Sequence, residues 1–115
     1  MAIFHIDSTE SKRFDNENMK KVTKQVLVDA EKGWESHVMR LFTLGAGGYS
    51  PKHQHPWPHI AFIVAGEGVI HLDGEDTKVR TGSYAFVPPG SEHQFTNTGP
   101  GDMQFICIVP TEGDV

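Results

Sequence analysis

Short runs of apolar or alternating apolar and polar residues, separated by turn residues, make up most of the chain after residue 20. No long stretch keeps the period of about 3.6 residues that marks an amphipathic helix, so the pattern predicts strands. Strands are expected over residues 22–29, 38–44, 60–64, 68–72, 77–80, 84–87, 93–96 and 103–109. So many short strands in one small domain predict an all-β sandwich or barrel.

Turn signals and the polar N-terminal region set the predicted boundaries. Asp73-Gly74 lies between two apolar runs and predicts a tight hairpin, because glycine tolerates positive φ. Residues 1–20 are polar and weakly patterned, and we expect them to form an N-terminal arm, with a short turn of helix at most. Residues 21–115 are then the barrel domain, because a chain of 115 residues has room for one core.

Composition and charge narrow the function classes. The formal net charge is −5 with ten Lys and Arg, which argues against a nucleic-acid-binding protein. We find no apolar run of membrane-spanning length and no basic signal region, so no membrane contact is expected, and the single cysteine fits a cytoplasmic location. The single Cys107 excludes an internal disulfide framework and lies within an apolar run. It is expected to be a packing cysteine rather than a nucleophile.

Four histidines in two short blocks are the strongest chemical signal. His53, His55 and His59 lie in one block, and His93 lies in the second, next to a predicted strand. Residues two apart in an extended chain point to the same side, so His53 and His55 can address one point. Neutral imidazole is the commonest protein ligand of Zn, Cu, Fe and Ni, so the four residues predict a divalent metal site. The alternative is a chance cluster of histidines on a loop.

The spacing of these histidines and of nearby glycines resembles the two motifs of the cupin superfamily. The first motif, G-x5-H-x-H-x3,4-E-x6-G, is matched with His59 standing where the family usually has glutamate, and the second, G-x5-P-x-G-x2-H-x3-N, is matched throughout. The matching residues are Gly47, His53, His55, His59 and Gly66 in the first motif and Gly82, Pro88, Gly90, His93 and Asn97 in the second.

The resemblance implies a fold, a cofactor and an assembly. It implies a single-domain jelly-roll β-barrel that holds one divalent transition metal ion per chain and is usually a homodimer. Mn, Fe, Co, Ni, Cu and Zn all accept imidazole ligands, so the sequence leaves the metal open. Cupin relatives commonly pair through an N-terminal strand, and residues 22–29 are the candidate for covering a sheet edge.

Histidine at position 59 changes the expected chemistry. Three His and one Glu leave a divalent ion with a site charge of about +1, whereas four neutral His leave about +2, which favours anionic ligands. With four protein nitrogens, an octahedral ion keeps two positions open for a substrate or a substrate and a small oxidant. The alternative is a closed tetrahedral zinc site with a structural role.

Candidate pocket residues follow from strand parity. Arg40 lies among apolar neighbours and is expected to bind a substrate carboxylate, with a solvated or edge-facing arginine as the alternative. Phe105 and Cys107 share one face of the last strand, which often lines the pocket in the family, and are expected to form pocket wall rather than plain core. His71 is expected to be structural or exposed, and Trp57 to pack at the site rim or in a dimer contact.

These features support three functional hypotheses. The first is a metal-dependent, oxygenase-type (dioxygenase-like) enzyme that acts on a small anionic organic substrate, with chemistry centred on the ion. The second is a non-redox isomerase or lyase, and the third is a binding cupin without turnover. The fold does not discriminate between these hypotheses.

Overall fold

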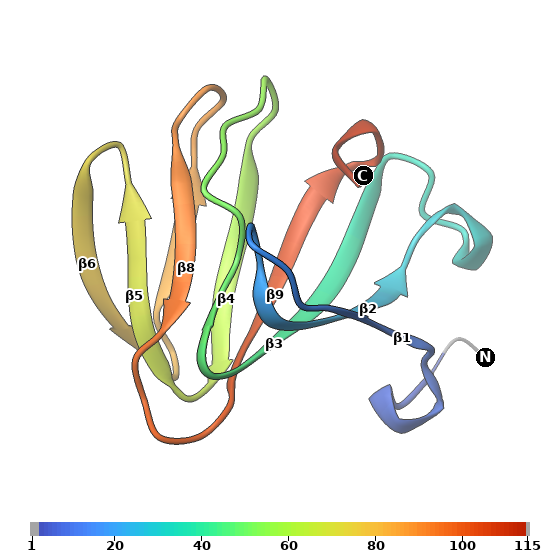
Figure 1. Cartoon of the computed structure of the whole chain (residues 1–115). Helices are drawn as coiled ribbons and strands as arrows, with labels where there is room; N and C mark the ends of the chain where they lie inside the picture. The colour runs from blue at the N-terminus through green and yellow to red at the C-terminus, as the bar shows by residue number, and fades with distance from the viewer. Residues whose placement is uncertain (1–2, 115) are drawn as a thin grey trace.

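The computed structural model describes residues 3–114 and consists mainly of one curled sheet of nine strands (Figure 1). The hydrogen-bonded order is β6-β5-β8-β3-β9-β4-β7, with β2 added on β3 and β1 on β2. The strands are β1 (Ser11–Phe14), β2 (Lys20–Val28), β3 (His37–Tyr49), β4 (His59–Ala65), β5 (Glu67–Leu72), β6 (Glu75–Arg80), β7 (Tyr84–Val87), β8 (His93–Asn97) and β9 (Met103–Pro110). The predicted all-β jelly-roll fold is confirmed.

Alternating burial explains why these segments form strands around one core. Along β9, the side chains from Met103 to Val109 are buried at every second position, and β8 shows the same alternation. Successive side chains of a strand point to opposite faces, so one face of each strand enters the interior. The apolar core that results contains Val22, Val38, Leu44, Ala61, Ile63, Ile70, Phe95, Met103, Phe105, Cys107 and Val109.

All eight predicted strands are present, and the hairpin prediction is confirmed. Leu72 pairs with Glu75, and Asp73 and Gly74 between them have φ of 48° and 85°. Two positive φ values in a two-residue loop match the twist of the flanking strands, and glycine adopts one of them without steric cost.

The N-terminal region contains a strand that the sequence did not predict. Residues 11–14 form β1, which pairs antiparallel with β2, and the ring of Phe14 packs against the core. The local pattern is too polar to signal a strand, and β1 forms because β2 presents a free edge. Helical structure within residues 3–114 is confined to three single 3-10 turns, η1 (Ile6–Ser8), η2 (Ala30–Lys32) and η3 (Thr111–Gly113). None of these helices is long and apolar enough to cross a membrane.

One outward face of the sheet is apolar. Ile60 pairs with Phe86 and Phe62 pairs with Tyr84 across β4 and β7. All four side chains remain exposed, between 45% for Phe62 and 79% for Tyr84. We call Ile60, Phe62, Tyr84 and Phe86 the outer apolar face. Strand β7 is also an end of the sheet, so this face adjoins an unpaired edge.

Candidate metal centre

Backbone hydrogen bonds bring the two histidine blocks together. The backbone N–H of His53 donates to the carbonyl of His93 at 3.1 Å, and the N–H of His93 donates back to His53 at 2.9 Å. The N–H of Gly90 donates to the carbonyl of His55 at 2.7 Å, and Gly90 has a φ of 80° that favours glycine. The loop after β3 is therefore pinned to the start of β8 by the glycine and histidine of the second motif.

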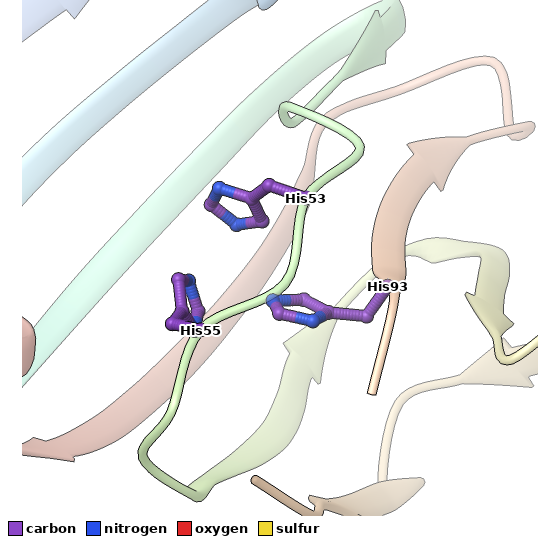
Figure 2. A group of neighbouring side chains, drawn as sticks. All are labelled: His53, His55 and His93. Atoms are coloured by element: carbon purple, nitrogen blue, oxygen red, sulfur yellow. The ribbon is translucent and has the colours of Figure 1, made fainter. Parts of the chain in front are cut away.

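The side chains of His53, His55 and His93 converge on one point (Figure 2). Each offers a ring nitrogen, and these three atoms all lie within 4.8 Å of one another. The ring centroids are 4.4 Å apart for His53 and His55, and 4.9 Å apart for His55 and His93. Three converging imidazoles are a donor set that fits a divalent transition metal.

His59 lies beside this group, at the first position of β4. Its Nε2 atom is 3.1 Å from Nε2 of His93, and its side chain is buried. Two nitrogens bound to one ion at about 2.1 Å are about 3 Å apart when they occupy adjacent octahedral positions. The separation of these two nitrogens therefore fits a shared ion. The three-histidine group is the tighter set, and ligation by His59 stays a prediction.

Hydrogen bonds to the other ring nitrogens orient two of the histidines. Nδ1 of His93 lies 2.9 Å from the carbonyl oxygen of Ser91, which can only accept, so Nδ1 carries the proton. The lone pair of His93 is then on Nε2, which faces the cluster. Nδ1 of His59 lies 2.9 Å from Sγ of Cys107, and this contact holds the second ring in place. Partners of this kind fix the orientation of metal-binding imidazoles.

The surroundings keep the histidines neutral. Burial lowers the pKa of His53 from 6.5 to about 4 and that of His59 to about 3, and neighbouring histidines and Arg40 add to both shifts. Burial also lowers the pKa of His55 and His93. Because the neutral imidazole is the form that binds a metal, the cluster is ready to bind one at neutral pH.

The cluster lines a cavity of about 170 Å³ whose wall contains the predicted pocket residues. Arg40, Phe105 and Cys107 all line this cavity. Nη2 of Arg40 lies 3.2 Å from Sγ of Cys107, and burial raises the pKa of that thiol. The ring of Phe105 stacks on Phe95 at 4.2 Å between centroids and is only 3% exposed. Phe105 and Cys107 therefore belong to the core and to the cavity wall at once.

Two charged residues lie beside Arg40 that were not predicted from the sequence as part of the site. Nζ of Lys24 lies 2.8 Å from Oδ1 of Asp114, and Nη1 of Arg40 lies 3.6 Å from the same oxygen. Lys24 lines the cavity as well. Its position in the alternation of β2, in phase with Val22 and Val26, was a signal that could have placed it on the inner face.

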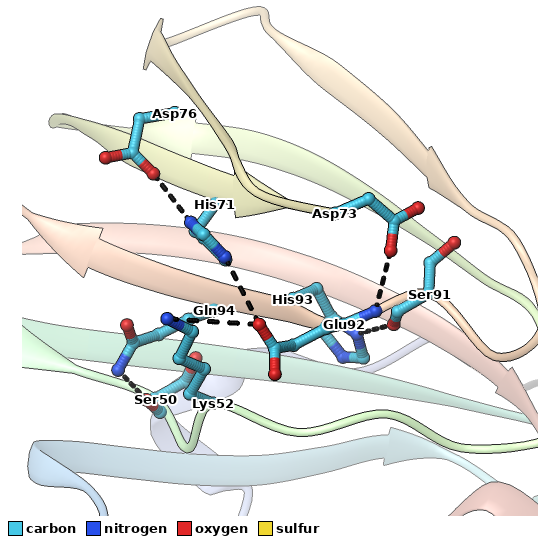
Figure 3. A network of polar contacts seen from close by, with 9 residues as sticks. All are labelled: Ser50, Lys52, His71, Asp73, Asp76, Ser91, Glu92, His93 and Gln94. Carbon is cyan, nitrogen blue, oxygen red and sulfur yellow. Dashed lines mark hydrogen bonds and ion pairs between the residues drawn. The ribbon is translucent and has the colours of Figure 1, made fainter.

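His71 lies outside the cluster, in a polar network that adjoins the cluster at His93 (Figure 3). Its Nδ1 is 2.8 Å from a carboxylate oxygen of Asp76, and its Nε2 is 3.4 Å from Oε1 of Glu92. The N–H of Glu92 donates to Asp73 at 3.0 Å. This network ties β5, β6 and the start of β8 together, which agrees with the structural role expected for His71.

Trp57 packs at the rim of the cluster. Its ring stacks on His55 with 4.9 Å between centroids and an angle of 12° between the planes. A Cβ atom placed on Gly113 would lie 2.6 Å from Nε1 of Trp57, so turn η3 packs directly on the indole. The expected packing role at the rim is what the structure has.

The fold and the paired histidine blocks define a metal-binding class of β-barrel, and comparison with known proteins identifies the family. The family model described as "Cupin domain" matches residues 40–109. The chain therefore belongs to the cupin family, as the two motifs indicated.

Individual relatives show the range of the family. The chain is 34% identical over 74 residues to the oxalate-binding protein of Thermotoga maritima, covering 61% of each chain. It is 37% identical over 71 residues to the dimethylsulfoniopropionate lyase DddQ of Ruegeria pomeroyi, covering 61% of this chain and 34% of the lyase. A crystal structure of a predicted oxalate decarboxylase from T. maritima superposes with a TM-score of 0.87 at 25% identity, covering 94% of this chain and 97% of that one.

The matched segments thus span less than two thirds of the length of these two curated relatives. The relatives differ in what they do, since one is a binding protein and the other a lyase. Membership of the family therefore establishes the fold and makes the three-histidine group a possible metal site, while the reaction has to be argued from the cavity.

Proposed function

We propose that this protein binds a divalent transition metal through His53, His55, His59 and His93 and acts on a small organic carboxylate by oxygenase-type chemistry. One observation carries the proposal, which is that neutral imidazoles and the guanidinium of Arg40 line the same cavity. A bound divalent ion supplies Lewis acidity and a template for substrate and a small oxidant. The chain itself supplies the site for the carboxylate, the oriented imidazoles and an apolar wall.

Arg40 is the residue proposed to recognise the substrate. Only 8% of its surface is exposed, and its Nε atom has no hydrogen-bond partner among the described residues. A buried donor without a partner costs free energy, and a carboxylate that accepts from guanidinium N–H groups relieves that cost. With a cavity of about 170 Å³, the substrate must be small.

Metal analysis followed by an oxygen-consumption screen tests this function. Purified protein is analysed for metals, and metal-free protein is reconstituted separately with Mn, Fe, Co, Ni, Cu and Zn. Each form is screened with small carboxylic acids, diketones and phenols. Oxygen uptake that requires both metal and substrate supports the proposal. Arg40→Met should weaken the response to carboxylates, and the matched control Arg80→Met, at an exposed position on β6, should not.

Two alternatives have specific support from the relatives. The likeness to a lyase favours non-redox turnover, which would convert substrate without consuming oxygen. The likeness to an oxalate-binding protein favours binding without turnover, which would give saturable binding of oxalate and no product. Product analysis of the same reactions by mass spectrometry separates these outcomes from the oxygenase.

The protein is also proposed to form a homodimer through the outer apolar face. Aromatic side chains bury about 150–250 Å² each, so Phe62, Tyr84 and Phe86 are a large part of the roughly 800 Å² that a stable interface needs from each partner. This face is uncharged, so a second copy with the same net charge of −5 meets no repulsion there. Strand β2, predicted to cover an edge, covers the edge of β3 in its own chain.

Light scattering tests the assembly. The wild type should have twice the monomer mass of 12.8 kDa, and Phe86→Asp should shift it toward the monomer. Lys78→Asp, at an exposed position on β6, is the control that should leave the dimer intact. A wild-type protein that is a monomer at all concentrations would contradict the proposal.

A further inference from the structure

Lys24 and Arg40 form a pair of cations whose shared partner comes from the last turn of the described chain. Oδ1 of Asp114 accepts from Nζ of Lys24 at 2.8 Å and lies 3.6 Å from Nη1 of Arg40. The side chains of these three residues are 15%, 10% and 23% exposed, in the order Lys24, Arg40, Asp114. Two largely buried cations on one carboxylate oxygen are the arrangement that binds an organic carboxylate.

The two cations belong to the rigid sheet, whereas Asp114 belongs to a single turn. Val26 pairs with Arg40 across β2 and β3, and Lys24 lies two residues before Val26, so both cations lie on one face of this ladder. Asp114 follows η3, which has three residues. Two hydrogen bonds hold the start of the turn to the loop before β3, from the N–H of Thr111 to the carbonyl of Ser36 at 3.0 Å and from the hydroxyl of Thr111 to the carbonyl of Glu35. Both bonds are made by Thr111, so the end of the turn that carries Asp114 can move while its start stays in place.

The same turn contributes to the wall of the cavity next to the histidine cluster. Gly113 is buried, lines the cavity and packs on Trp57, which stacks on His55. A movement that removes Asp114 from the cations would also lift Gly113 from Trp57. One short segment thus supplies both Gly113 of the cavity wall and the carboxylate that the two cations share.

We propose that Lys24 and Arg40 form a carboxylate subsite in the cavity wall, and that Asp114 is an internal carboxylate that occupies this subsite until a small organic carboxylate displaces it. The turn from Thr111 to Asp114 then acts as a strap over the cavity, released by the anion that enters. While an internal ligand occupies a site, an external ligand cannot bind there. The apparent affinity for the external ligand is therefore its intrinsic affinity multiplied by the fraction of molecules in which the site is free. The inference rests on the proposed function only in that the anion enters the same cavity.

Anion binding to metal-free protein tests the subsite independently of metal binding and turnover. Acetate is the probe, and tryptophan fluorescence is the readout, in a Trp34→Phe background so that Trp57 reports alone. Asp114→Asn removes the internal carboxylate charge and should strengthen acetate binding by about tenfold, the gain expected when a charge-assisted competitor is lost. Lys24→Met in the Asp114→Asn background should reverse most of this gain.

Two further variants separate the effect of charge from the effect of displacing the turn. Glu112→Gln removes the same charge from an exposed position of the same turn and should leave acetate affinity unchanged. Gly113→Ala places a Cβ atom against Trp57 and should lift the strap without changing its charge. It should therefore also strengthen acetate binding and shift the emission of Trp57.

The opposite results would overturn the inference. If Asp114→Asn lowers thermal stability and leaves acetate affinity unchanged, Asp114 is a structural ion-pair partner and no subsite exists. If Glu112→Gln strengthens acetate binding as much as Asp114→Asn does, the gain comes from the lower negative charge of the protein as a whole and not from release of a subsite. If acetate binds as expected but the metal-loaded protein shows no oxygen uptake, the subsite stands and the proposed oxygenase function fails.

Discussion

Two polar regions at the cavity are built in opposite ways. The histidine cluster consists of neutral groups, held by backbone hydrogen bonds between the loop before β4 and the start of β8. The second region consists of charged groups, since Lys24 and Arg40 share the single carboxylate of Asp114. Cys107 lies between the two regions, because its Sγ atom is 2.9 Å from Nδ1 of His59 and 3.2 Å from Nη2 of Arg40.

This difference between the two regions shows how one small barrel can offer sites for a cation and an anion side by side. Burial keeps imidazoles neutral and so favours a metal ion, because desolvation penalises the protonated ring. Burial does not neutralise an arginine, so Arg40 requires a counter-charge. A substrate carboxylate near the cluster would meet both a metal ion and a guanidinium, and the following predictions test this division of roles.

The largest expected effect is loss of the metal from the histidine cluster. His93→Ala removes one of the proposed metal ligands, so metal content per chain should fall at least tenfold. Elemental analysis of dialysed protein measures this. His37→Ala, at a histidine beside Trp34 and outside the cluster, is the control and should bind as much metal as the wild type. Full metal occupancy in His93→Ala would contradict the assignment of the metal site.

Removal of the ring of Phe105 should be the next largest effect. Its side chain is 3% exposed and stacks on Phe95 and Phe42, so Phe105→Ala should lower the free energy of unfolding by about 3–5 kcal/mol through cavity formation. Urea denaturation measures the loss. The enlarged cavity should also admit larger anions without a change in metal content. A large loss of stability with unchanged ligand access would make Phe105 a core residue only.

Replacement of His59 by the residue usual in the family tests the charge of the metal region. His59→Glu should retain the metal and lower the site charge by one, which should weaken azide binding by about tenfold, or about 1.4 kcal/mol. Spectroscopic titration of the cobalt-loaded protein with azide measures the affinity. His59→Gln, which removes the imidazole without adding charge, separates charge from ligation. An unchanged affinity in His59→Glu would mean that His59 does not coordinate.

The stability of the metal-free protein is also expected to depend on pH. The pKa of His53 is lowered to about 4 and that of His59 to about 3, so between pH 6.5 and these values the unfolded chain binds more protons than the native one. Stability should therefore be full above pH 6.5 and fall as the pH is lowered toward 4. Thermal denaturation across this range measures the trend. The double variant His53→Gln, His59→Gln should show a weaker slope, and an equal slope would contradict the assignment.

The sequence determined the strands, the hairpin and the pairing of His53 with His55 because each depends on local order. Alternation of apolar residues specifies which side of a strand is buried, and a two-residue turn specifies its own backbone angles. The position of Asp73-Gly74 and the spacing of His53 and His55 needed no knowledge of distant residues. The motif with His93 added its distant partner through family resemblance.

Only the tertiary structure decided which side chains from separate strands meet. Strand β1 depends on the free edge of β2, and the contact of Cys107 with both His59 and Arg40 depends on the register of β3, β4 and β9. The meeting of Asp114 with Lys24 depends on how the last turn packs. Long-range register is set by the packing of the whole core, and no local pattern of the chain encodes it.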